Sequence, residues 1–157
     1  MNNKYINIYN NLVNLTRNKE LYKNFYKQDT FQDRLIYFLF HFAFFLKVFK
    51  KKNNKNLLQD IYDEIFRYLE LSIREEGYGD ATINKKMKNY LNTFHSILDQ
   101  INHWEIAADS HKTKVLSDFL NIDKNISNLI DYFDNYLVNL SNNTLNFYIK
   151  GVVKDKF

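Results

Sequence analysis

The sequence predicts an all-α protein, a single compact domain of five to seven helices that spans residues 1–157. Three observations predict this class. Hydrophobic residues make up 45% of the chain and aromatic residues 17%, which is enough for one buried core at this length. The chain contains no proline, so the commonest helix breaker is absent. Apolar residues recur at spacings of three and four nearly throughout, which is the period of an amphipathic helix.

The expected helices follow one another without a linker or a repeat. The first covers residues 6–13 and continues at residues 21–25 after a polar break. Thr30, with Asp33 three residues later, is close to a capping box and predicts the start of the next helix. Further apolar stripes predict helices at residues 35–49, 57–76, 83–101, 115–120 and 126–140, with Asp123 as the cap of the last one and a final turn closed by Gly151.

The most apolar segment is LIYFLFHFAFFLKVF at residues 35–49, with His41 in its middle. It is too short to cross a bilayer, which takes about 20 apolar residues, so we expect a central, buried helix. His41 is then a core histidine, hydrogen-bonded to a neighbouring helix. Because the apolar side chains cover most of the circumference, we also predict that one side borders a groove for a client or partner helix. The apolar face of the helix at residues 83–101 would form the other wall.

Residues 74–88 read REEGYGDATINKKMK and hold two of the chain's three glycines. Gly77 can adopt the left-handed conformation that ends a helix. Gly79 lets the chain turn again, and Asp80 or Thr82 can cap the next helix.

The charges of this turn oppose the helix dipoles, because acids end one helix and lysines begin the next. The residues concerned are Glu75 and Glu76 on one side and Lys85, Lys86 and Lys88 on the other. Acids and lysines that pair across the turn would explain the pattern. Charges that both helix dipoles disfavour, on the two sides of one turn, are also typical of a functional site. We interpret this turn as such a site.

The same stretch resembles the signature of the ubiquinol–cytochrome c chaperone family, which reads R-E-x-G-x-G-D and, after four residues, K-K-x-K. The matching positions are Arg74, Glu75, Gly77, Gly79, Asp80, Lys85, Lys86 and Lys88. Upstream, Phe25-Tyr26 and Asp29-Thr30-x-x-x-Arg34 resemble the family's F-Y and D-T-x-x-G-R segments, and His41 stands where the family's apolar helix carries a histidine. Gln28, Asp33 and Asn84 replace a proline and two glycines of the family pattern. The resemblance covers about residues 5–100.

This resemblance implies an all-α assembly factor for respiratory complex III, ubiquinol–cytochrome c reductase. The client would be newly made cytochrome b or another complex III subunit, with a small partner protein, the ribosome and peripheral membrane contact as further expectations. The N-terminal MNNKYINIYNN lacks the pattern of a secretory signal. We therefore expect a cytoplasmic (bacterial) or mitochondrial matrix location, at the inner-membrane face. The residues expected to bind client or partner are the eight motif positions together with Arg34 and His41.

No enzyme is predicted. The chain has no cysteine, no phosphate-binding glycine loop, no G-x-S-x-G elbow and no H-E-x-x-H pair. Three further histidines, His95, His103 and His111, recur at eight-residue steps, whereas ligands on one helix are spaced by three or four. We interpret them as surface residues and expect no catalytic residue, no metal, no cofactor and no DNA binding.

A second function, in a different class, stays open at this point. The lysines at residues 47–55 and 85–88, with Tyr90 and other aromatics, are compatible with an RNA- or ribosome-binding helical module. The first cluster, which is Lys47, Lys50, Lys51, Lys52 and Lys55, also suits the negative end of a helix dipole. Phosphate contacts weaken steeply with salt whereas apolar contacts do not, so salt dependence separates the two functions.

Overall fold

The computed structural model describes residues 3–22, 31–51, 55–120, 122 and 126–151. These residues form seven α-helices and two 3-10 helices and contain no strand, which confirms the predicted all-α class. The α-helices are α1 (Ile6–Thr16), α2 (Phe31–Lys50), α3 (Lys55–Arg74), α4 (Asp80–Gln100), α5 (Asp109–Phe119), α6 (Ile126–Ser141) and α7 (Leu145–Lys150). The 3-10 helices are η1 (Lys19–Tyr22) and η2 (Trp104–Ile106).

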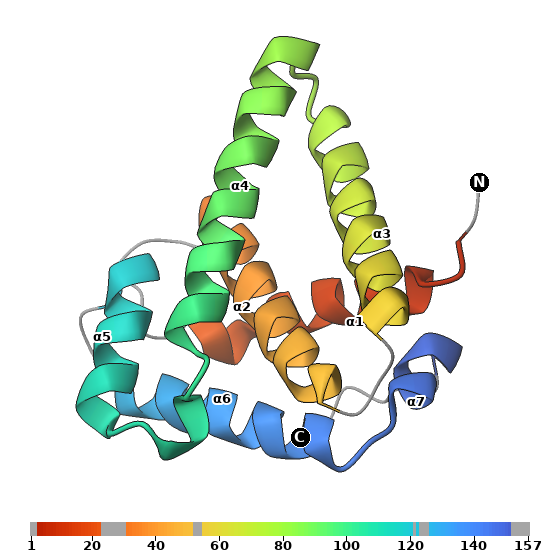
Figure 1. Ribbon diagram of the computed structural model, residues 1–157. Helices are drawn as coiled ribbons and strands as arrows, with labels where there is room; N and C mark the ends of the chain where they lie inside the picture. The colour runs from red at the N-terminus through yellow and green to blue at the C-terminus, as the bar shows by residue number, and fades with distance from the viewer. Residues whose placement is uncertain (1–2, 23–30, 52–54, 121, 123–125, 152–157) are drawn as a thin grey trace.

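Helix α2 is the centre of the molecule. It packs against α1, α3, α4 and α6, which surround it (Figure 1). All eleven residues from Leu35 to Phe45 are buried, as are Val48 and Phe49, so the prediction of a central helix is confirmed. Of the helices that the structure describes, none has the length and apolar character needed to cross a membrane.

The groove predicted beside α2 is not formed by the described residues, and that prediction is wrong. Phe42 of α2 is fully buried and stacks on Phe94 of α4, with ring centroids 5.3 Å apart. The apolar face of α4 is also closed, since Ile83, Phe94, Ile97 and Ile101 are at most 1% exposed. The physical reason is the size of the aromatic side chains, which fill the spaces between α2 and each of its neighbours.

Helices α3 and α4 form a hairpin shaped like an inverted V (Figure 1). Its apex, the turn at residues 75–79, lies far from α5, α6 and α7 in this view. Every residue from Arg74 to Asp80 and on to Thr82 is exposed, whereas Ile73 and Ile83 on either side are buried. We call the exposed residues 74–82, together with Lys85, Lys86 and Lys88 in the first turns of α4, the hairpin tip.

Other expectations differ from the structure in detail. Helix α5 begins at Asp109, six residues before the predicted start, because its first turns are polar and so carry no apolar stripe. Gly151 has φ of +75° and ends α7 as predicted. The expected caps Thr30 and Asp123, and the motif positions Phe25, Tyr26, Gln28 and Asp29, lie outside the described residues.

Candidate functional site

Gly77 lies in the hairpin tip, three residues after the last residue of α3, and prevents that helix from continuing. Gly77 has φ of +93°, a left-handed conformation that residues with a side chain rarely adopt. Its N–H donates to the carbonyl oxygen of Arg74 at 3.0 Å, and the N–H of Glu76 donates to that of Ile73 at 3.1 Å. The predicted role of Gly77 is therefore confirmed.

Gly79 plays a different part from the one predicted. It is itself the N-cap of α4, with φ of −74° and ψ of 163°, and its carbonyl accepts from the N–H of Ile83 at 3.0 Å. Asp80 is the first helical residue, so the prediction that Asp80 or Thr82 caps this helix is wrong. A Cβ added at Gly79 would meet nothing within 4 Å. Neither the backbone conformation nor packing within the molecule requires glycine at this position.

One ion pair crosses the tip, between the last residue of α3 and the first residue of α4. Arg74 Nη1 lies 2.6 Å from Asp80 Oδ1, and Arg74 Nε lies 3.4 Å from Glu70 Oε2 on its own helix. Asp80 is not the cap because Gly79 occupies the N-cap position and Asp80 follows it inside the helix, where its carboxylate accepts from Arg74.

The remaining charges of the tip are not paired in this way. Within the described part of the chain no ion pair joins Glu75, Glu76, Lys85 or Lys88 to another residue. For these residues, the suggested pairing of acids with lysines across the turn is therefore not observed. The acids stay at the C-terminal end of α3 and the lysines at the N-terminal end of α4, where each helix dipole disfavours them.

Tyr78 belongs to the site although the sequence did not single it out. It lies between the two glycines, is 45% exposed, and its ring centroid is 4.7 Å from Lys86 Nζ. A cation over an aromatic face at this distance is a favourable contact. The sequence feature that could have identified Tyr78 is a large aromatic residue between two glycines in an otherwise polar turn.

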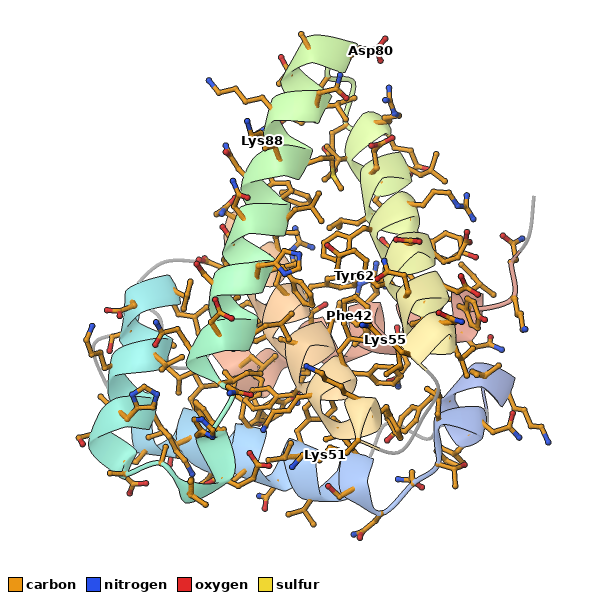
Figure 2. The ribbon with its side chains drawn as sticks, viewed as in Figure 1. Phe42, Lys51, Lys55, Tyr62, Asp80 and Lys88 are labelled. Carbon is orange, nitrogen blue, oxygen red and sulfur yellow. The ribbon has the colours of Figure 1, made fainter. Side chains whose placement is uncertain are left out.

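The two lysine clusters lie at opposite ends of the hairpin. Figure 2 shows Lys88 near the tip, while Lys51 and Lys55 lie toward the other end of α3. Helix α3 has 20 residues and is therefore about 30 Å long. Tyr90, the aromatic residue expected to assist RNA binding, is only 7% exposed. The clusters do not form one surface with it.

His41 is a core residue with both ring nitrogens hydrogen-bonded. Its Nδ1 lies 2.6 Å from the carbonyl oxygen of Tyr37, and its Nε2 lies 2.7 Å from the hydroxyl of Tyr132 on α6. Because a carbonyl only accepts, Nδ1 carries the proton and Nε2 accepts from Tyr132. Burial lowers the pKa of His41 to about 4, against a smaller opposite effect of the bond to Tyr37.

The predicted core histidine is thus confirmed, and the structure places it away from the hairpin tip. Arg34 is exposed on the first turn of α2 and is also not part of the tip. The structure brings together the other eight predicted positions, which are Arg74, Glu75, Gly77, Gly79, Asp80, Lys85, Lys86 and Lys88. His95, His103 and His111 are exposed as expected. The described residues include no group of three side chains suited to hold a metal ion.

The structure is thus an all-α core that displays a charged hairpin tip. The chain belongs to the ubiquinol–cytochrome c chaperone family, whose sequence model matches residues 23–134. The match confirms the resemblance carried by the tip motif, but it begins at residue 23 instead of about residue 5 and extends beyond residue 100 into α6. The family links the chain to assembly of ubiquinol–cytochrome c reductase, respiratory complex III. Comparison with curated proteins and with solved structures gave no match.

Proposed function

We propose that this protein is a non-enzymatic assembly chaperone of complex III that holds newly made cytochrome b through its hairpin tip. Family membership supports the complex III role. The observation that carries the assignment to the tip is its exposure. Residues 74–82 are all exposed, and they include most of the charged and glycine positions of the family motif.

The unpaired charges of the tip favour contact with another molecule. Glu75 and Glu76 face the unfavourable end of one dipole, and Lys85 and Lys88 that of the next. A partner with complementary charges stabilises both sets at once, and such complementarity directs specificity and association rate. The open space around Gly79 allows the backbone of the partner to approach closely.

Recognition at the tip is polar rather than apolar. The faces of α2 and α4 that could hold an apolar client segment are buried inside the molecule. We therefore expect the tip to bind a charged, solvent-exposed segment of cytochrome b instead of a membrane-spanning helix. A small partner protein and the ribosome complete the proposed setting, at the cytoplasmic face of a bacterial inner membrane or the matrix face of a mitochondrial one.

A gene deletion tests this proposal. Complex III and cytochrome b should fall on native gels while other respiratory complexes stay largely intact. Wild-type protein should restore them, and a triple variant with Glu75→Ala, Lys85→Ala and Lys88→Ala should not. Normal complex III in the deletion strain would refute the function. Full rescue by the triple variant would refute the assignment to the tip.

A further inference from the structure

Helix α5 lies at the edge of the molecule, where it packs mainly on α6 (Figure 1). Its inward face is formed by Lys112, Val115, Leu116 and Phe119, at the spacing of one helical stripe. Val115 and Leu116 are buried, and Phe119 meets Phe40 of α2 edge to face, with ring centroids 5.7 Å apart. Lys112 occupies the first position of this otherwise apolar stripe and is only 7% exposed. A lysine is almost never fully buried unless it is paired.

The partner of Lys112 is Asp134 of α6. Lys112 Nζ lies 3.1 Å from Asp134 Oδ1, and it also stands over the ring of Trp104, 5.2 Å from the centroid. The same carboxylate oxygen accepts from the indole Nε1–H of Trp104 at 2.7 Å. One atom of Asp134 therefore ties both α5 and the η2 turn to α6.

The η2 turn is anchored to the core independently of α5. Trp104 is fully buried and meets Phe44 of α2 edge to face, with ring centroids 5.2 Å apart. Lys47 of α2 pairs with Glu105 at 2.9 Å and donates to the carbonyl oxygen of Asn102 at 2.7 Å. This turn can therefore stay in place when α5 moves.

The backbone on both sides of α5 is extended. Ala107 and Ala108 have ψ of 146° and 154°, and Leu120 has ψ of 140°. A few residues at the ends of an element are enough to absorb the dihedral changes of a hinge. His111 Nε2 also lies 3.2 Å from the carbonyl oxygen of Gln100, but this contact is exposed, so water can replace it at little cost.

An ion pair holds a helix differently from an apolar contact. When the contact opens, the ammonium of Lys112 and the carboxylate of Asp134 regain their hydration, which offsets much of the lost attraction. An apolar side chain gains nothing from water when it is exposed. Lys112 therefore makes release of α5 easier than an apolar residue at the same position would, while Asp134 keeps the closed position specific.

We propose that α5 is a flap that opens as one unit about Ala107 and Ala108 while the α2 core stays folded, and that the Lys112–Asp134 ion pair is its latch. Opening separates Phe119 from Phe40, and Lys112 from Trp104. The protein then exposes aromatic surface that the closed form buries. The inference does not depend on which client the hairpin tip binds.

Hydrogen–deuterium exchange of the full chain, measured for single amides by NMR, tests the proposal. The amides of residues 113–119 should exchange at least about tenfold faster than those of residues 36–49, because local opening costs less than global unfolding. Exchange in α5 should depend little on low concentrations of urea, since a flap exposes little surface. Exchange in α2 should depend on urea steeply.

A core substitution far from the flap separates local opening from global unfolding. Ile65 of α3 is fully buried, and α3 lies on the other side of the molecule from α5 (Figure 1). Ile65→Val should speed exchange in α2 and leave α5 unchanged, because its contacts stay formed in both the closed and the open flap. Equal acceleration of the two helices would show that α5 opens only when the whole protein unfolds, and would overturn the proposal.

Two substitutions change the latch in opposite directions. Asp134→Asn leaves the ammonium of Lys112 without a counter-ion and should speed exchange in α5 roughly tenfold. Lys112→Met, an apolar residue of similar length, should slow it. The matched control is Asp118→Asn, which removes the exposed ion pair with Lys114 on the same helix and should exchange like wild type.

The variants also show whether the latch is the right one. An α5 exchange rate that Asp134→Asn leaves unchanged, or that Asp118→Asn raises as much, would refute the role of the ion pair. If Asp134→Asn does not fold, Lys112→Met decides alone, and unchanged or faster exchange in α5 would refute the latch. Complex III levels in the deletion strain judge the proposed function separately, because that test does not involve α5.

Discussion

Arg74 Nη1 and Asp80 Oδ1 lie 2.6 Å apart and join the end of α3 to the start of α4. The pair spans the Gly77–Gly79 turn, so it sets how the two helices meet at the hairpin tip. Both side chains are exposed, with relative exposures of 38% for Arg74 and 84% for Asp80. An ion pair this exposed adds little to global stability, and its effect is therefore local.

A double-mutant cycle on Arg74 and Asp80 tests whether the two residues act through their ion pair or each contact the client. Arg74→Gln, Asp80→Asn and the combined variant should all melt close to wild type, because the pair is exposed. If the two residues act through each other, the combined variant should restore complex III in the deletion strain about as well as either single variant. Additive losses would mean that each residue contacts the client itself.

The two glycines of the tip should respond differently to alanine. Gly77→Ala places a Cβ at φ of +93° and should destabilise the protein by about 1–2 kcal/mol. Gly79→Ala should change the free energy of unfolding by less than about 0.5 kcal/mol, since φ is −74° and the space is open. Urea denaturation of both variants measures this difference. Equal destabilisation would contradict the assigned conformations, and lost complex III with Gly79→Ala alone would indicate close approach of a partner.

The acids and lysines of the tip should be dispensable for folding. Glu75→Ala, and Lys85→Ala with Lys86→Ala, should leave helicity unchanged and the unfolding free energy within about 0.5 kcal/mol of wild type. Binding of the client or partner should fall in co-precipitation from cells. Lys114→Ala on α5, an exposed lysine paired with Asp118, is the matched control and should bind normally. Unfolding of the tip variants would show that the charges are structural.

The buried histidine predicts a pH dependence of stability. The pKa of His41 is lowered to about 4 in the folded protein, whereas an unfolded histidine titrates near 6.5. The unfolded chain therefore binds more protons between these values, so this group costs no stability above about pH 6.5 and destabilises progressively as the pH falls toward 4. Over that window the loss from His41 is about 3 kcal/mol.

Denaturation across this pH range, compared between wild type and His41→Gln, isolates the histidine from the carboxylates. The variant should show a shallower fall in stability at low pH. Its lower absolute stability does not affect this comparison. If the variant does not fold, the imidazole C–H signals of wild type provide the test by NMR. Titration of His41 near its ordinary pKa would contradict its burial and its bonds to Tyr37 and Tyr132.

Local features of the sequence determined the helical class, the burial of most of residues 35–49 and the left-handed turn at Gly77 that follows α3. Apolar spacing reports which side of a helix is buried, and steric limits on φ identify where glycine is needed, so neither requires knowledge of distant residues. The charged motif with its two glycines was likewise sufficient to indicate the family. These properties depend on neighbours in the chain and could be predicted from it.

Contacts between helices were decided only by the tertiary structure. The sequence offered Asp80 as a cap of α4, but in the folded protein Gly79 is the cap and Asp80 pairs with Arg74 at 2.6 Å. Closure of the predicted groove depends on Phe42 meeting Phe94, which are far apart in sequence. The bond from Trp104 to Asp134, which fixes the η2 turn, had no signal in the periodicity. Periodicity gives the direction in which a side chain points, but the position of its partner follows from how the helices pack in space.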